Sequence, residues 1–167
     1  AFEGPLLLDA DALNIMAKAR AELISARKGR PIILTPHPGE MARLLGSDSA
    51  SVQADRLGAC RSLVSDGGLT VVLKGAATVV ADGARLAFNS SGNPGMASAG
   101  MGDVLAGTAG AFAAAGLGPF EAASLAVYLH GRAADLLAAK LGGPGFLAGE
   151  VADALPEALS ALIARSA

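Results

Sequence analysis

The sequence contains few charged residues, and neither sign dominates. Of its 167 residues, 13 are Lys or Arg and 15 are Asp or Glu, which gives a formal net charge of −2. Without a basic excess, a nucleic-acid partner held by a positively charged surface is excluded. Any anionic ligand must therefore be bound by local geometry. The apolar share of 52% excludes a disordered chain, which would be poor in apolar residues.

Cysteine and long apolar runs are also scarce. Cys60 is the single cysteine, so an internal disulfide cannot form, and a cytoplasmic location is the simplest expectation. The Ala-rich stretch 104–115 is interrupted by Gly107 and Gly110 and is shorter than the roughly 20 residues of a membrane span. We therefore predict no membrane partner.

The start of the chain lacks both a methionine and the pattern of a signal peptide, and an apolar run begins almost at once at Leu6. Domains seldom open so abruptly, so we expect N-terminal sequence to be missing. The length otherwise fits one domain, residues 1–167. The high apolar content predicts that further surface is buried against a partner subunit or additional chain.

Short apolar runs alternate with helical patterns along the chain. The predicted strands are residues 6–8, 32–34, 70–73, 78–81 and 85–88. The predicted helices are one after Asp9, then about 40–45, 51–66 and a helix-rich region from about Asp103 with breaks at 116–119 and 142–145. The last two strands flank Asp82-Gly83, which is a hairpin signal. This order predicts an α/β fold, a mostly parallel sheet flanked by helices with an antiparallel hairpin attached.

A glycine-bearing loop, residues 89–102, carries the clearest signal of a binding site. It leads into a predicted helix, so Gly100, Met101 and Gly102 could offer backbone N–H groups and the positive end of the helix dipole to an anion. Asp103 follows directly, where a carboxylate would repel that anion. It makes chemical sense as the acceptor of a proton from a group that attacks phosphorus. The alternative is an ordinary turn with Asp103 as the N-cap.

Polar residues also follow each of the three predicted parallel strands. Lys74 follows the third strand, where open α/β sheets bind ligands, and could meet a phosphate. His37 follows the second strand and could hydrogen-bond a polar substrate group. Asp9, with Asp11 and Asn14, follows the first strand and could hold ribose hydroxyls or a hydrated cation. Each has a structural alternative: a surface lysine, a loop histidine without a role, and helix caps.

Each of these indications is weak alone, but four motifs that contain them occur in the order and spacing of a known family. They are residues 8–14, the His-Pro-Gly-Glu segment 34–41, the Lys-Gly-Ala-Ala-Thr segment 73–78, and the glycine-rich segments 92–97 and 100–105. The chain resembles the C-terminal part of the ADP/ATP-dependent NAD(P)H-hydrate dehydratases, which belong to the ribokinase-like superfamily. The resemblance covers nearly the whole chain, so residues 1–167 are expected to form one ribokinase-like domain.

The resemblance implies repair of NADHX and NADPHX, the hydrated forms of the reduced nicotinamide cofactors, with release of AMP and phosphate from ADP. ATP replaces ADP in eukaryotic members, and Mg²⁺ is implied as a cofactor. Asp103 would be catalytic and, with His37, would contact the hydrated cofactor, while Glu40 and Asn93 would contribute to substrate or Mg²⁺ binding. The implied nucleotide contacts are Lys74, Gly75, Ala76, Ala77, Thr78 and Gly102.

The resemblance further implies a homo-oligomer, commonly a tetramer, and fusion to or pairing with an NAD(P)HX epimerase. Family domains are longer at the N-terminus, so the sheet is expected to be incomplete, with an open apolar edge or face. Two other functions stay open. One is a small-molecule kinase of the hydroxyethylthiazole-kinase type, and the other is a nucleotide-binding domain without catalysis.

Overall fold

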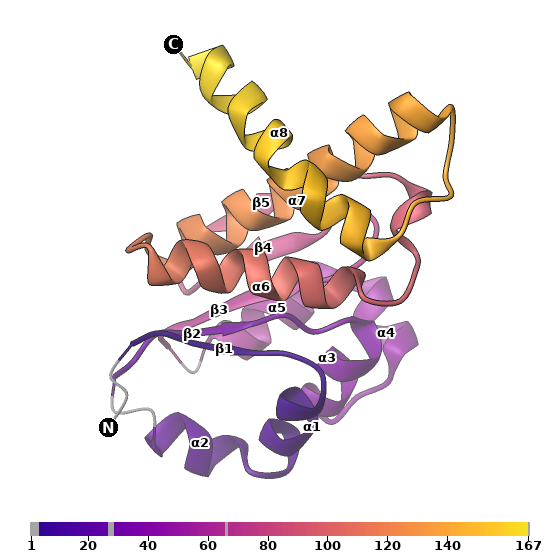
Figure 1. The fold of residues 1–167 in the computed structure, drawn as a ribbon. Helices are drawn as coiled ribbons and strands as arrows, with labels where there is room; N and C mark the ends of the chain where they lie inside the picture. The colour runs from indigo at the N-terminus through magenta and orange to yellow at the C-terminus, as the bar shows by residue number, and fades with distance from the viewer. Residues whose placement is uncertain (1–3, 27–28, 66, 167) are drawn as a thin grey trace.

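The computed structural model describes residues 4–26, 29–65 and 67–166. Within them a five-stranded sheet has the spatial order β1-β2-β3-β4-β5 (Figure 1). The strands are β1 (Leu6–Leu8), β2 (Ile32–Leu34), β3 (Leu69–Leu73), β4 (Val79–Ala81) and β5 (Leu86–Phe88). The first three strands run parallel, and β4 and β5 add an antiparallel hairpin. The predicted fold class is confirmed, and the strand boundaries agree within one residue.

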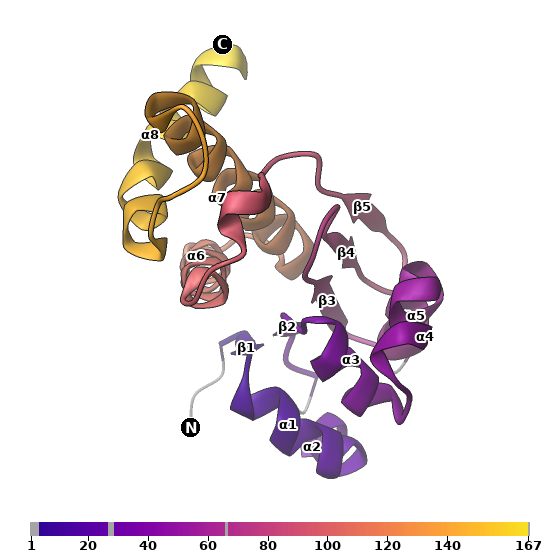
Figure 2. The ribbon, with the colours of Figure 1, turned by 90° about the vertical axis from the view of Figure 1, so that its right-hand side faces the viewer.

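Five helices cover one face of the sheet (Figure 2). They are α1 (Asp11–Lys18), α2 (Arg20–Ala26), α3 (Pro38–Leu45), α4 (Ser49–Ala54) and α5 (Arg56–Val64). Because side chains alternate along a strand, Ile32 and Leu34 point into this core while Ile33 points to the opposite face. Strands β2, β3 and β4 are buried throughout, as expected where helices cover both faces of a sheet.

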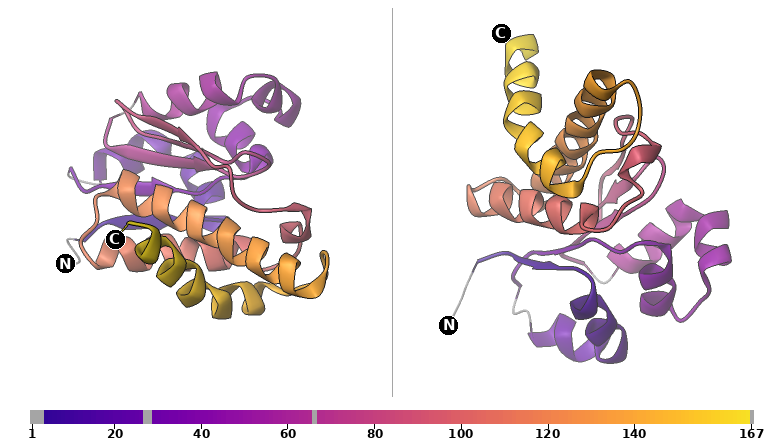
Figure 3. Two further views of the ribbon diagram at one scale, coloured as in Figure 1. Left: turned by 90° about the horizontal axis from the view of Figure 1, so that it is seen from above. Right: turned by 45° about the vertical axis from the view of Figure 1, so that its right-hand side comes forward.

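Helices α6 (Met101–Ala114) and α7 (Pro119–Leu141) cover the other face, against Ile33, Val72 and Val80. Alanines 122, 123 and 126 are fully buried in this layer. Helix α8 (Ala148–Ser166) lies outside α6 and α7, and its C-terminal end projects from the body of the molecule (Figures 1 and 3). A single 3₁₀ turn, η1 (Pro94–Met96), interrupts the glycine-bearing loop.

Two predicted helices are each divided in the structure, so these predictions are wrong in detail. The helix expected at 51–66 ends at Ala54 and restarts at Arg56, because Asp55 leaves helical geometry and accepts the Gly58 N–H at 2.7 Å. The helix expected after Asp9 is likewise split into α1 and α2 at Ala19. In both cases the apolar periodicity continues across the break, which hides it from pattern analysis.

Strand β1 stands at the edge of the sheet, and its three leucines are half-buried. Between this edge and α6 lies a cavity of about 390 Å³, lined by Leu6, Leu7, Ile33 and the small residues Gly110, Ala113 and Ala114. The expected open apolar edge is therefore present. None of the described helices combines the length and apolarity that crossing a membrane requires.

Candidate active site

The carboxyl ends of the three parallel strands bring Asp9, Glu40 and Lys74 together. The Nζ atom of Lys74 lies 2.8 Å from Oδ1 of Asp9 and 3.7 Å from Oε2 of Glu40. All three side chains are largely buried, with 19%, 13% and 8% of the lysine, aspartate and glutamate exposed. A partly desolvated ammonium between two carboxylates is a charge network rather than a surface lysine, so that alternative is wrong.

The N-terminus of α6 faces this cluster. Gly100 forms the N-cap in the left-handed region at φ 84°, where an L side chain would be strained. A Cβ added at Gly102 would lie 3.4 Å from Nζ of Lys74 and 3.7 Å from Oδ2 of Asp9, so the first turn of the helix touches the charge network. The first N–H groups of a helix have no partner within it, and here they lie beside a cation. The predicted anion hole therefore adjoins Lys74.

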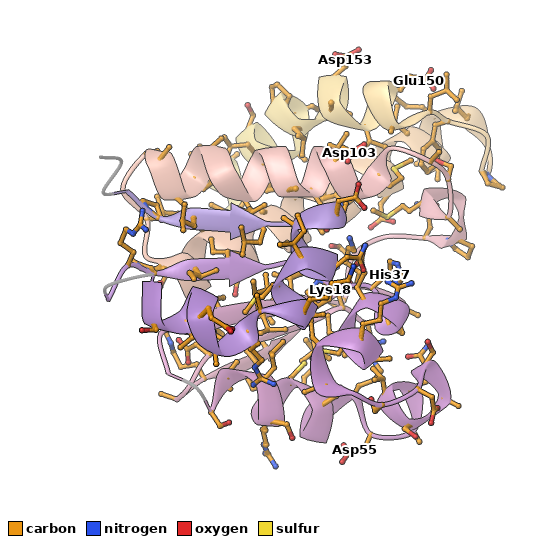
Figure 4. All side chains as sticks on the ribbon, turned by 90° about the horizontal axis from the view of Figure 1, so that it is seen from below. Lys18, His37, Asp55, Asp103, Glu150 and Asp153 are labelled. Carbon is orange, nitrogen blue, oxygen red and sulfur yellow. The ribbon has the colours of Figure 1, made fainter. Side chains whose placement is uncertain are left out.

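Asp103 is not the N-cap of α6. The helix begins at Met101, two residues earlier than expected, and no side chain caps it. Asp103 is the third residue of the helix and is exposed. Figure 4 shows Asp103 and His37 at the same end of the sheet. The carboxylate is therefore available to a ligand, and the alternative of an ordinary cap is wrong.

His37 begins α3 with a reciprocal capping box, which the sequence reasoning missed. Its Nδ1 accepts the N–H groups of Gly39 at 3.0 Å and Glu40 at 3.4 Å, and the Glu40 carboxylate accepts the His37 N–H at 2.7 Å. Because Nδ1 acts as an acceptor, we assign the proton of the neutral ring to Nε2. Nε2 lies 3.5 Å from Oε1 of Glu40, and half of the His37 side chain is exposed, so a ligand can reach the ring beside that carboxylate.

Residues Lys74 to Thr78 form a tight turn between β3 and β4. Thr78 Oγ1 donates to the Gly75 carbonyl at 2.9 Å, and Ala77 has a positive φ of 51°. Arg56 supports the turn from α5, because its Nη2 donates to the Leu73 carbonyl at 2.9 Å. Burial lowers the pKa of Arg56 below its ordinary value. Local sequence patterns contain no signal for this role of Arg56, since the carbonyl that it binds lies 17 residues away along the chain.

Two further residues predicted for the site, Asn93 and Asn14, make their hydrogen bonds outside the charge network. The side chain of Asn93 joins its loop to α7, because Nδ2 donates to Asp135 of that helix at 3.1 Å. Its Oδ1 accepts the N–H of Gly95, within the loop, at 3.1 Å. Asn14 links α1 to α3 by accepting a bond from Arg43 at 2.9 Å. No side chain caps α1, so the expected capping by Asp9 or Asp11 is wrong, and Asp9 pairs with Lys74 instead.

Cys60 offers no alternative chemistry. The thiol is fully buried beneath the sheet, and burial raises its pKa from 9.0 to about 11. A thiol that stays protonated in an apolar core is a poor nucleophile. The described residues contain no group of three or more His, Cys, Asp or Glu side chains that could enclose a metal ion.

The mixed sheet with helices on both faces has the ribokinase-like fold, as in a ribokinase-like superfamily protein from Enterococcus faecalis that gives a TM-score of 0.72 and 28% identity over 90% of this chain and 50% of its own. Hydroxyethylthiazole kinase from Pyrococcus horikoshii shares this architecture, with a TM-score of 0.72 and 25% identity over 90% of this chain and 59% of its own. The chain itself belongs to the NAD(P)H-hydrate dehydratase family, whose model matches residues 1–157.

Individual relatives agree with this assignment. The ADP/ATP-dependent NAD(P)H-hydrate dehydratase from Bacillus subtilis, co-crystallised with ATP and Mg²⁺, gives a TM-score of 0.78 and 32% identity over 93% of this chain and 54% of its own. The ADP-dependent (S)-NAD(P)H-hydrate dehydratase from Neisseria meningitidis is 53% identical over 70 residues, 42% of this chain and 24% of that protein. A bifunctional NAD(P)H-hydrate repair enzyme from Escherichia coli is 46% identical over 73 residues, 44% of this chain and 13% of that protein. The chain spans about half the length of the solved relatives it matches.

Proposed function

We propose that this chain takes part in ADP-dependent dehydration of NADHX and NADPHX, which regenerates NADH and NADPH. The observation that carries the proposal is the position of Lys74 and Asp9 beside Gly102 at the start of α6, with Asp103 exposed one residue further on. Phosphoryl transfer needs positive potential at the transferring group and a base for the attacking hydroxyl. The N–H groups with Lys74 supply the first, and Asp103 supplies the second.

In the first step, Asp103 accepts the proton of the hydroxyl at carbon 6 of the hydrated nicotinamide ring. The hydroxyl oxygen then bonds to the β-phosphorus of ADP, and the bond from that phosphorus to the oxygen of AMP breaks. The N–H groups of Met101 and Gly102 neutralise the charge that develops on the phosphoryl oxygens. In the second step, the ring nitrogen lone pair expels phosphate from carbon 6, and the iminium that forms loses a proton from carbon 5 to the departing phosphate, which creates the double bond between carbons 5 and 6. Reduced cofactor, AMP and phosphate result.

Binding of the two ligands is divided between two loops. Lys74 and the turn Gly75–Thr78 would hold the nucleotide, because the turn exposes backbone groups next to the ammonium. His37 would orient the hydrated cofactor through Nε2–H, which lies 3.5 Å from Oε1 of Glu40, on a side chain that is half exposed. Asn93 would contribute to the substrate side through the conformation of its loop, since its amide is already hydrogen-bonded within the chain.

A Mg²⁺ ion fits the charges at this edge of the sheet. Mg²⁺ in nucleotide enzymes is usually held by one or two carboxylates together with phosphate oxygens. Asp9 and Glu40 are the two carboxylates that flank Lys74, and they would hold it. When bound, the ion would neutralise charge on the nucleotide phosphates.

The decisive assay incubates NADHX with either ADP or ATP and follows the return of reduced-nicotinamide absorbance together with phosphate release. It uses both the 167-residue chain and a form extended to the length of the relatives. We expect both signals with ADP. A stable phosphorylated product would instead support the small-molecule kinase, and ADP binding without turnover in both forms would support a non-catalytic domain.

The oligomeric state, the cellular location and the association with other proteins are predictions. A tetramer and an association with an epimerase follow from the resemblance to the family, and a cytoplasmic location follows from the single cysteine. The bifunctional relatives are compatible with a second repair activity in the same polypeptide or the same complex.

A further inference from the structure

One carboxylate on α7 fastens the loop that leads into the anion hole. Asp135 accepts the N–H of Gly92 at 3.0 Å through Oδ2 and the Nδ2 of Asn93 at 3.1 Å through Oδ1. The amide oxygen of Asn93 in turn accepts the N–H of Gly95 at 3.1 Å and caps η1. These bonds join the carboxylate, the amide and the 3₁₀ turn into a continuous chain.

The same loop is packed closely against α7 and the start of α8. A Cβ added at Gly131 would lie 2.8 Å from the backbone N of Gly92, and one added at Gly95 would lie 2.8 Å from the Phe146 ring. At the end of the loop, a Cβ added at Gly100 would lie 3.1 Å from that of Ala148. Small residues therefore let the loop lie directly on the two helices, and its path is fixed at three places before α6 begins.

We propose that Asp135 is a positioning residue for the phosphoryl-binding turn at Gly100–Gly102. The inference rests on the proposed function, which assigns that turn to the transferring phosphoryl group. Asp135 is not in contact with the charge network, and it acts through Gly92 and Asn93. Hydrogen bonds that involve a charged group are stronger than neutral ones, so the carboxylate holds the loop more firmly than a neutral acceptor would. The charged side chain of Arg132 also lies near Asp135, with its Nη1 3.7 Å from Oδ2 of the carboxylate.

The hydrogen-bond pattern provides a sharp test, because Asn93 and Asp135 can exchange their chemistry. Asp135→Asn leaves one acceptor oxygen for two donors, so one bond is lost. In the double variant Asn93→Asp with Asp135→Asn, the amide at position 135 can accept from Gly92 and donate to the carboxylate at position 93. That carboxylate can still accept from Gly95, so every bond is restored. Asp153→Asn, on the exposed side of α8, is the matched control.

The experiment measures amide hydrogen exchange in residues 89–102, the melting temperature and NADHX turnover for the four proteins. We expect Asp135→Asn to speed exchange in this loop at least tenfold and to lower kcat at least tenfold, with the KM for NADHX changed less than threefold. The double variant should recover most of both losses, and Asp153→Asn should match wild type. A purely structural role would lower the melting temperature and raise exchange throughout the chain.

Each outcome separates this inference from the proposed function. If wild type shows no turnover, hydrogen exchange still decides whether Asp135 orders the loop, and ADP affinity reports on the anion site. Unchanged exchange in residues 89–102 of Asp135→Asn would overturn the positioning role. So would failure of the double variant to recover, or an equal effect of Asp153→Asn.

Discussion

At the residue scale, the proposed site divides into a candidate base and a separate set of candidate binding groups. Asp103 is exposed in the first turn of α6, whereas Lys74 and Asp9 are mostly buried and paired at 2.8 Å. Because the network holds itself together without Asp103, loss of that carboxylate should leave the nucleotide site formed. Catalysis and nucleotide binding should therefore be separable by mutation.

Asp103→Asn should abolish the proton acceptor while it keeps the size and polarity of the side chain. General base catalysis contributes typically 10²–10⁴-fold, so we expect kcat to fall at least about 100-fold. The dissociation constant for ADP, measured by calorimetry, should stay within a few-fold of wild type. Turnover close to that of wild type would contradict the role of Asp103 as proton acceptor.

His37 has two tasks that two substitutions can tell apart. His37→Asn keeps an N-cap acceptor for α3 but removes the Nε2–H donor, whereas His37→Ala removes both. We expect both variants to raise the KM for NADHX about tenfold or more with little change in ADP affinity. Only His37→Ala should also lower the free energy of unfolding, by about 1 kcal/mol. Equal losses of ADP and NADHX binding would place His37 elsewhere in the site.

At the element scale, helix ends rather than helix interiors decide how the layers fit. His37 caps α3, Asp48 caps α4 and Asp55 caps α5, each by accepting backbone N–H groups. The break at Asp55 also sets the start of α5, so that Arg56 reaches the Leu73 carbonyl and supports the turn formed by residues 74–78. A local capping preference thus contributes to the geometry of the site.

Asp55→Ala should test this contribution. Losing the bond to the Gly58 N–H should lower the free energy of unfolding by about 1 kcal/mol, as is typical for an N-cap. Urea denaturation would measure the change, and Asp153→Ala on an exposed helical surface serves as the control. A shift no larger than that of the control would show that α5 does not depend on the cap.

At the scale of the whole molecule, a buried histidine should couple folding to pH. His130 lies in α7 with 6% of its surface exposed, and its Nε2 has no hydrogen-bond partner among the described residues. Burial lowers the pKa of His130 from 6.5 to about 4. The folded chain therefore keeps the ring neutral in a pH range where the unfolded chain protonates it.

Because the unfolded state binds the extra proton between pH 6.5 and about 4, stability should fall as the pH is lowered through that range. The loss reaches about 3 kcal/mol at its lower end and then levels off. Urea denaturation of wild type and His130→Gln across this range should show a smaller acid loss in the variant. Parallel pH profiles would contradict the assignment.

The apolar composition also has its explanation at this scale. The β1 edge and the small residues of α6 border one cavity of about 390 Å³, and a second cavity of about 550 Å³ lies between α6 and α8. Large apolar side chains such as Leu147 and Ile163 remain exposed, at 70% and 61%. The 52% apolar share therefore fills three apolar clusters among the described residues and still leaves apolar surface open to further contacts.

Local sequence patterns were enough to predict the strands, the hairpin at Asp82 and the glycine-rich approach to α6, because apolar periodicity and turn chemistry depend on neighbouring residues. They also placed Asp9, His37 and Lys74 at one edge, since parallel strands share their carboxyl ends. Only the tertiary structure decided that Lys74 pairs with Asp9, 65 residues away, and that Asp135 binds Asn93, 42 residues away. Such pairs depend on strand order and helix packing, which local sequence patterns do not encode. The motifs thus specify which groups the site contains, and the packing of distant segments decides which of them act together.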